Sequence, residues 1–486
     1  MRLLVILAAA SLLASPAHAD PVGGEFVPGR VVVKWRSPSV MRTVANATLH
    51  RAVAADRQIL QTAPTREATL ALVATLSANP DVAYAEPDYI RHRTGDPITP
   101  SDPLFARQWA LPMINAPQAW SRSTGSSAVT VAIIDTGAVM HPELAERIAG
   151  GYDFITDPTN AADGGGRDED WTDTGDSTDQ SSALHGTHVA GIIAAQSNNG
   201  VGVAGLDWGC RLVIVRALGV RHGTGVDSDI SDAIRWAAGL HVDGVPDNPH
   251  PAAVINMSFG GAGFSQSMQD AIHEAVGAGT IVVAAAGNLA VDAKGDSPAG
   301  LDGVISVGAV DPTGVMASYS NYGSVVSLMA PGGSPLRDPM TGQPEGVLST
   351  IQLVGSGFTY TYYAGTSQAA PFVSGTVSLM KGLFPGMNAS DARRLLSATA
   401  NPSAKCANPS DPTLAGCGAG LLDVDAALAA AADAGLAGGG GHLNNEVHGG
   451  FGCAIAPAAA DAPAATGGWL LFLAGLAVAA LRRRVL

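Results

Sequence analysis

The sequence has few basic residues. Among 486 residues, Lys and Arg together number 27 against 42 Asp and Glu, and the formal net charge is −15. This acidic balance argues against a nucleic-acid partner, because binding to phosphates requires a basic surface. The sequence also contains no glycine motif of the kind that cradles phosphates, which disfavours a nucleotide-binding protein. The hydrophobic content of 47% indicates one large folded domain with accessory segments.

The apolar runs at the two ends of the sequence are too short for an ordinary membrane span, which needs ~18 residues. The first run, residues 3–13, follows a basic residue and is followed by the small-residue sequence AHA at residues 17–19. This pattern predicts a secretory signal peptide over residues 1–19, cleaved after Ala19. A first transmembrane helix is the weaker alternative.

Residues 20–100 are predicted to form a small, separate α+β unit. Residues 30–35 and 81–87 have the composition of strands, and residues 66–78 have helical spacing. A unit of roughly 80 residues is marginal for independent stability, and the pattern by itself does not identify its role.

From residue 101 to residue 432 short apolar runs alternate with helical segments. Near-continuous apolar runs are typical of strands that are covered on both faces. The predicted strands are 129–134, 212–215, 254–257, 281–286 and 304–307, and the predicted helices include 230–240 and 268–278. We therefore expect an α/β fold, a doubly wound parallel sheet flanked by helices, with its site beyond the carboxyl ends of the strands.

The sequence GTSQAAP at residues 365–371 precedes an apolar run and predicts a turn that leads into a helix. Ser367 would lie in the first turn, where unpaired backbone N–H groups and the helix dipole favour developing negative charge. A serine that attacks a carbonyl generates such charge. A simple N-cap is the alternative, because a nucleophile also requires a base, an orienting carboxylate and an oxyanion donor.

Three other positions could supply these groups. Asp135 ends the first predicted strand, His185 opens a predicted helix, and Asn288 follows another strand after Gly287. Each position has a simpler interpretation: Asp135 and Asn288 could be turn residues, and His185 could bind a metal together with His188. The metal interpretation lacks a third ligand. An Asp, a His and a Ser at strand and helix ends are together typical of a serine-protease triad.

With these motifs the chain resembles the subtilisin-like serine proteases (subtilases), in their secreted bacterial branch, over nearly all of residues 20–432. The matching sequences are IIDTG at 133–137, HGTHVAG at 185–191, NMSFGG at 256–261, AGN at 286–288 and GTSQAAP at 365–371. The resemblance implies a subtilisin-like fold and a serine endopeptidase that hydrolyses peptide bonds of extended protein substrates through an acyl-enzyme.

The resemblance also assigns roles to single residues. It makes Ser367 the nucleophile, His185 the general base and then acid, and Asp135 the residue that orients His185. Asn288, with the backbone N–H of Ser367, would form the oxyanion hole.

The resemblance implies that the segments 258–260 and 223–225 hold an extended substrate between them as an added strand. Backbone pairing of this kind does not depend on the side chains, so it implies broad specificity. Leu289, beside Gly287, suggests an apolar preference at the residue before the cut. The substrate-binding residues that the resemblance implies are Ser258, Phe259, Gly260, Gly223, Thr224, Gly225 and Gly287.

Residues 20–100 are similar to the inhibitory propeptide that assists the folding of such enzymes and then occupies their cleft. Autocatalytic removal of this propeptide would cut the chain between residues 92 and 101. A parallel sheet with distant strand pairings folds slowly, so a folding chaperone of this kind is physically reasonable.

Residues 157–179 form an acidic, glycine-rich loop. Its carboxylates repel one another unless a cation lies between them, and Ca²⁺ accepts flexible oxygen ligands. A solvated loop without metal is the alternative. Related secreted subtilases often bind calcium here, so we expect a structural Ca²⁺ site with the candidate ligands Asp163, Asp168, Asp170 and Asp173.

The four cysteines have different expected roles. Cys406 and Cys417 flank a loop rich in Pro, Asp and Gly, and we expect them to form a disulfide in an oxidising compartment. Cys210 is predicted to be a buried free thiol.

Residues 433–466 are rich in Gly and Ala and predict a linker. Residues 467–486 contain two glycines, an apolar run and three arginines, and they resemble the carboxyl-terminal sorting tails of Gram-negative surface proteins, which a membrane protease trims. A lasting membrane anchor and attachment through Cys453 are the alternatives. The protein is expected to be secreted or located at the cell surface.

Two hypotheses follow. The first is an active, self-processing protease whose partners are protein substrates and its own propeptide, without an organic cofactor. The second is a catalytically silent binding or chaperone domain on the same fold. Competent residues at all four catalytic positions favour the enzyme.

Overall fold

The computed structural model describes residues 26–37, 43–54, 56–89, 96–175, 184–353, 357–402 and 416–437. The predicted signal peptide, most of the predicted linker and the predicted sorting tail lie outside these residues, as do residues 92–95 of the predicted processing region. Among the described residues, no helix has the length and apolar character needed to cross a membrane.

The N-terminal unit is a four-stranded antiparallel sheet with one helix, α1 (Arg66–Ser77). Val31, Val33 and Leu60 from the sheet pack against Leu72 and Leu76 of the helix. The predicted strand, helix and strand are present. The two additional strands were not predicted, since one is exposed along its whole length and has no apolar alternation. In the order β2-β3-β1-β4, the strands are β2 (Thr48–Ala54), β3 (Arg57–Gln61), β1 (Phe26–Trp35) and β4 (Val82–Tyr89).

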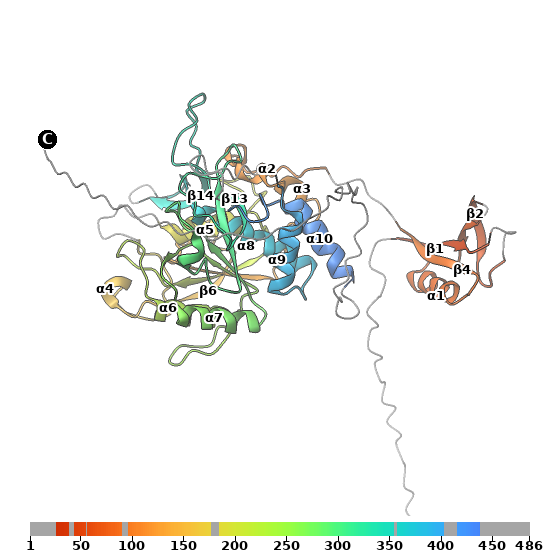
Figure 1. Cartoon of the computed structure of the whole chain (residues 1–486), viewed down its shortest axis with the longest axis horizontal. Coiled ribbons are helices and arrows are strands. Elements are labelled where there is room, and N and C mark those ends of the chain that lie inside the picture. Colours follow the sequence, from red (N-terminus) through yellow and green to blue (C-terminus); the bar gives the residue numbers. More distant parts are fainter. Residues whose placement is uncertain are drawn as a thin grey trace, which may run out of the picture. The chain divides into compact units, whose positions relative to one another are not determined.

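A seven-stranded sheet, parallel in every strand pair, forms the centre of the second unit (Figure 1). All five strands predicted in this region are present, and their ends differ from the prediction by at most three residues. In the order β13-β12-β10-β8-β5-β7-β6, they are Val326–Pro331, Val304–Val310, Ile281–Ala285, Val254–Met257, Thr130–Asp135, Arg211–Arg216 and Ile148–Asp153.

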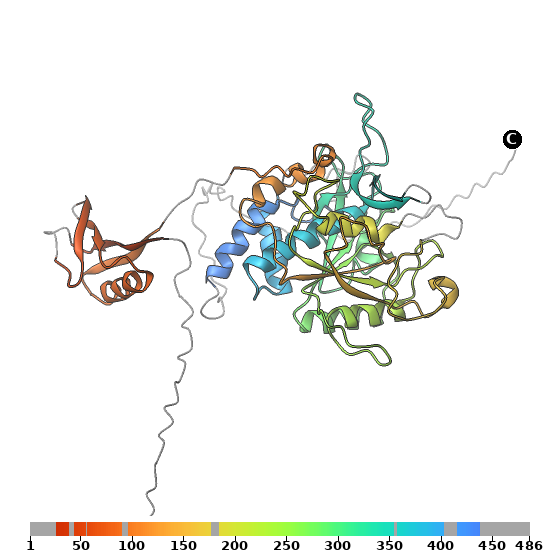
Figure 2. The same ribbon diagram turned by 180° about the vertical axis from the view of Figure 1, so that it is seen from behind.

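Helices cover both faces of this sheet (Figures 1 and 2), which confirms the predicted doubly wound α/β fold. Along β5, Val131 and Ile133 belong to one core cluster, whereas Ala132 and Ile134 belong to the other. The strand is therefore apolar at every position from Val131 to Ile134, since each face is buried. One face packs against α5 (His185–Ala194), α8 (Thr366–Leu383), α9 (Ala389–Thr399) and α10 (Val424–Ala437), and the other packs against α6 (Asp227–Ala237) and α7 (Gln266–Gly277).

The remaining elements are short or lie beside the sheet. β14 and β15 form an antiparallel hairpin, and β9 pairs with β11. Their bounds, with those of the short helices, are β14 (Val347–Leu353), β15 (Gly357–Tyr363), β9 (Gly261–Ala262), β11 (Asp296–Ser297), η1 (Phe105–Arg107), α2 (Ala110–Met113), α3 (Ala116–Ala119), α4 (Pro158–Ala161) and η2 (Ala293–Gly295).

Candidate active site

The carboxyl ends of three adjacent strands carry the polar residues that the sequence singled out. Asp135 is the last residue of β5, Ser258 follows β8, and Asn288 follows β10 after two intervening residues. Helices α5 and α8 begin at His185 and at Thr366, next to Ser367. The predicted location, beyond the strand ends, is therefore where these residues lie.

Asp135 and His185 form a hydrogen-bonded pair. His185 Nδ1 lies 2.8 Å from Asp135 Oδ1, and the Asp135 side chain has no solvent exposure. Since an ionised carboxylate only accepts, Nδ1 carries the hydrogen, and Nε2 is the ring nitrogen that can take up a proton. Leu184, which precedes the helix, has the left-handed φ of 42°. A non-glycine residue in this conformation is strained, and such strain often occurs where a catalytic side chain is held.

A set of hydrogen bonds next to Asp135 supports its position, and the sequence did not predict it. Thr136 Oγ1 donates to Asp173 Oδ2 at 2.6 Å and accepts from the N–H of Gly186 at 3.0 Å. Thr136 thus joins the end of β5 to the first turn of α5. Burial raises the pKa of Asp173 to about 7. Asp173 is therefore a buried support of the Asp135 turn in this structure.

Ser367 is the second residue of α8 and is half-buried. Its hydroxyl donates to the carbonyl oxygen of Ser258 at 2.8 Å, and the Ser258 hydroxyl donates back to the Ser367 carbonyl at 2.9 Å. A hydroxyl has one proton, so in this rotamer Ser367 does not donate to His185. A nucleophilic role for Ser367 would require its hydroxyl to give up the first of these bonds, as is common before substrate is bound.

The side-chain amide of Asn288 has a fixed orientation. Its Oδ1 accepts from the backbone N–H of Thr366 at 2.8 Å and from the Thr366 hydroxyl at 2.9 Å. Because the oxygen is held by these two bonds, Nδ2 is turned to the opposite side of the amide, where it can donate to a developing oxyanion. Gly287 has a φ of 105°, a conformation that only glycine adopts readily.

Asn321 is a residue that sequence reasoning missed. It is fully buried, and its Oδ1 accepts from the N–H groups of Leu289 and Val291 at 2.9 and 3.2 Å. Its Nδ2 donates to the carbonyl of Ala286 at 3.0 Å and to Asp296 Oδ2 at 2.7 Å. These bonds hold the turn on both sides of Asn288. No local pattern in the sequence pointed to this contact, which joins segments that are distant in the chain.

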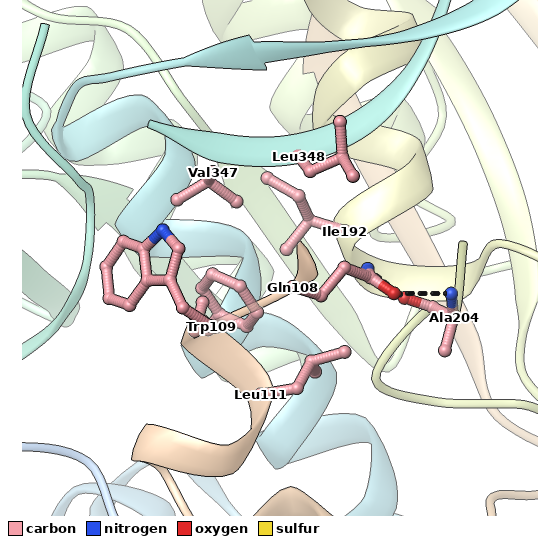
Figure 3. Close-up of a pocket in the computed structure, with 9 residues that line it drawn as sticks. Gln108, Trp109, Leu111, Ile192, Ala204, Val347 and Leu348 are labelled. Atoms are coloured by element: carbon pink, nitrogen blue, oxygen red, sulfur yellow. Dashed lines mark hydrogen bonds between the residues drawn. The ribbon is translucent and has the colours of Figure 1, made fainter. Parts of the chain in front are cut away.

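The two predicted substrate-binding segments contribute residues to the lining of one pocket, which has a volume of about 310 Å³. Gly223, Thr224 and Gly225 line it together with Phe259 and Gly260. Ser258 instead faces the start of α8, as described above. A smaller cavity of about 10 Å³ (Figure 3) lies among Trp109, Val347 and other apolar side chains; it holds at most one water molecule and cannot bind a substrate.

The acidic loop does not have the arrangement expected of a calcium cage. Among the described residues there is no group of three or more His, Cys, Asp or Glu side chains that could hold a metal ion. Asp163 forms an ion pair with Arg216 at 2.5 Å, and Arg216 also pairs with Asp153. The positive charge that the loop requires is thus supplied by a fully buried arginine.

The carboxylates of the other predicted ligands accept hydrogen bonds from nearby protein groups. Asp168 Oδ1 accepts from the N–H of Asp170, and Asp170 Oδ1 accepts from the N–H of Thr172. Asp173 binds Thr136 and the N–H of Gly175. Within the described part of the loop the four residues form no shared Ca²⁺ site, and two further acidic residues, at 176 and 179, lie outside that part.

Two other carboxylates, Asp102 and Glu143, are buried, and one oxygen of Glu143 has no hydrogen-bond partner among the described residues. Glu143 is 1% exposed; its Oε1 accepts from the Tyr360 hydroxyl at 3.0 Å, and its Oε2 has no hydrogen-bond partner. Burial, with a smaller contribution from the charge of Asp102, raises the pKa of Glu143 to about 7. Asp102, also buried, accepts from the N–H groups of Asn198 and Asn199. Buried carboxylate oxygens of this kind suit a hard cation such as Ca²⁺.

The cysteine predictions are partly testable. Cys210 is buried and free, as expected, and burial raises the pKa of its thiol. Cys417 takes part in a disulfide. Cys406, its predicted partner, and Cys453 lie outside the described residues, so the pairing stays a prediction.

Residues 126–429 match the model of the protein family described as the subtilase family. An extracellular protease of Xanthomonas campestris is 43% identical over 384 residues, which cover 74% of this chain and 61% of that protein. An extracellular basic protease of Dichelobacter nodosus is 40% identical over 65% of this chain and 53% of its own length. The chain thus spans little more than half the length of these two relatives.

Other relatives are matched over most of their length. Thermitase of Thermoactinomyces vulgaris is 35% identical over 305 residues, which cover 62% of this chain and 92% of thermitase. A solved protease structure from Pseudoalteromonas arctica has a TM-score of 0.63 and 42% sequence identity, and it covers 69% of this chain and 100% of that structure.

Proposed function

The chain belongs to the subtilase family, and from this premise we propose that it is a secreted serine endopeptidase that cleaves extended protein substrates with Ser367, His185 and Asp135. The observation that carries the proposal is the 2.8 Å hydrogen bond between His185 and the buried carboxylate of Asp135. Relatives named as extracellular proteases support secretion.

The proposed reaction proceeds in two steps. Ser367 Oγ attacks the carbonyl carbon of the scissile bond, and its proton passes to His185 Nε2 while Asp135 stabilises the imidazolium. The oxyanion accepts hydrogen bonds from Asn288 Nδ2 and from the backbone N–H of Ser367. Collapse expels the amine, which takes the proton from His185. A water molecule then hydrolyses the acyl-enzyme by the same proton route and restores Ser367.

Substrate binding is proposed to occur between the segments at 223–225 and 258–260, which border one pocket. Backbone pairing there gives broad specificity. Leu289 is 72% exposed beside the Asn288 turn. This apolar surface supports an apolar preference at the residue before the cut.

We also propose that residues 20–100 act as an inhibitory propeptide that the enzyme removes from itself. The test is intact mass, with terminal sequencing, of wild type and Ser367→Ala expressed from the full chain. Loss of the segment in wild type alone is expected. Loss in both proteins would remove Ser367 from the reaction, and retention in both would favour a silent domain or maturation by another enzyme.

For a structural Ca²⁺ ion, the buried pair Asp102 and Glu143 replaces the acidic loop as the proposed site. The unpartnered Glu143 Oε2 supports this assignment. The ion would supply positive charge and order; it has no proposed part in catalysis.

A further inference from the structure

The pocket between the two proposed substrate segments has an apolar floor. Leu218, Ile230 and Met268 line it and are almost fully buried. Their side chains come from the loop after β7, from α6 and from α7. A substrate side chain that enters this pocket therefore meets an apolar surface over its inner part.

The edge of the same pocket carries a charge. Among the described residues that line it, Asp227 is the one ionisable side chain. Asp227 is exposed and is the first residue of α6.

The charge of Asp227 is not neutralised within the described part of the chain. None of the ion pairs formed there includes Asp227, whereas its neighbours Asp229 and Asp232 both pair with Arg167. Phe264, which is 68% exposed, also lines the pocket. An aromatic ring and a free carboxylate are both favourable partners of a cation.

We propose that this pocket accepts a basic side chain of the substrate, Arg or Lys, and that Asp227 selects it. The aliphatic stem would cover the apolar floor while the charged head remains near Asp227 and water. The inference rests on the proposed protease function and adds a substrate class to it. It differs from a purely apolar subsite, which would exclude a charged head.

The experiment uses the mature protein with wild-type sequence, Asp227→Asn, Asp227→Glu and Asp243→Asn. Peptide substrates carry Gln, Arg or Leu, in turn, at each of the three positions that precede the residue before the cut. At one position, wild type is expected to cleave the Arg peptide with a kcat/KM roughly 3- to 10-fold above that of the Gln peptide. The ratio should fall toward one in Asp227→Asn and be kept in Asp227→Glu.

Asp243→Asn is the matched control. It removes the same charge from a fully exposed position beyond the other end of α6, a helix of 11 residues that is about 16 Å long. Its Arg/Gln ratio should equal that of wild type. Since the Debye length falls to about 3 Å at 1 M salt, the wild-type ratio should also shrink at that concentration. Thermal unfolding of each variant reports folding separately.

The outcomes distinguish a failure of the proposed role of Asp227 from a failure of the proposed protease function. Peptide cleavage that depends on Ser367 but shows no Arg preference, or a preference that Asp227→Asn leaves unchanged, would overturn the role of Asp227 and leave the protease function standing. An equal loss in Asp243→Asn would assign the preference to overall charge. Absence of any Ser367-dependent cleavage would overturn both.

Discussion

Replacement of Asn321 by Ala tests whether the proposed oxyanion donor is held in place by the turn around it. The substitution removes three hydrogen bonds to the backbone of that turn and one to Asp296. Each bond contributes about 1 kcal/mol, and each buried group left unsatisfied costs about 1–3 kcal/mol. With partial relaxation we expect the free energy of unfolding to fall by about 3–5 kcal/mol.

The expected fall in kcat has an upper limit. Complete loss of one oxyanion donor lowers kcat by about 10²–10³-fold. Asn288 keeps its two bonds to Thr366 in this variant and is displaced rather than removed. A roughly 10- to 100-fold fall in kcat is therefore expected, with little change in KM, because the donor acts in the transition state.

The assay is steady-state hydrolysis of a peptide below the melting temperature of each variant. Asn248→Ala is the control: Asn248 is also buried and donates to the carbonyls of Trp236 and Ala237, but it lies beyond the C-terminal end of α6. It should lose stability and keep kcat. A normal kcat in Asn321→Ala, or an equal loss in Asn248→Ala, would refute the positioning role.

Three further predictions concern the same fold. Gly287→Ala should abolish most activity, because its Cβ would lie 2.3 Å from Asn321 Nδ2 at a φ of 105°; kinetics of a folded variant, verified by circular dichroism, checks this. Burial lowers the pKa of His188 to about 3. Below pH 6.5 the unfolded chain therefore binds a proton that the folded state does not, and stability falls by up to about 1.4 kcal/mol per pH unit down to pH 3. Urea unfolding of His188→Gln should lack this contribution, and an unchanged pH slope would contradict it. Excess chelator should lower the melting temperature of wild type and of Asp170→Asn by roughly 5 °C but leave that of Glu143→Gln unchanged. If chelator instead left the melting temperature of Asp170→Asn unchanged, the ion would be assigned to the acidic loop.

The sequence was sufficient for five of the seven strands of the parallel sheet and for the residues at their ends. Asp135 and Asn288 could be located because β5 and β10 are continuous apolar runs and a parallel sheet gathers its carboxyl ends at one edge. Strands β6 and β13 were missed. The sequence IAGGYD of β6 contains two glycines and no such run, and the sequence VSLMAP of β13 is interrupted by a serine and ends in a proline.

The supports of the site could not be predicted, because they depend on contacts between distant segments. Asn321 lies in a turn without a regular pattern, and its role exists only once the Asn288 turn is folded against it. The same cause applies at the acidic loop. Asp163 and Arg216 are 53 positions apart, and the loop read alone suggested a missing cation that the chain itself supplies.

The distribution of the proposed catalytic groups along the chain has a consequence for biosynthesis. The base and its orienting carboxylate come from the first half of the sequence, whereas the nucleophile comes from the first turn of α8, near its last quarter. A ribosome that has made three hundred residues has produced both members of the Asp–His pair but no hydroxyl for them to activate. A nascent or truncated product that ends before Ser367 thus lacks the proposed nucleophile, and hydrolytic competence arrives only after most of the domain has been translated.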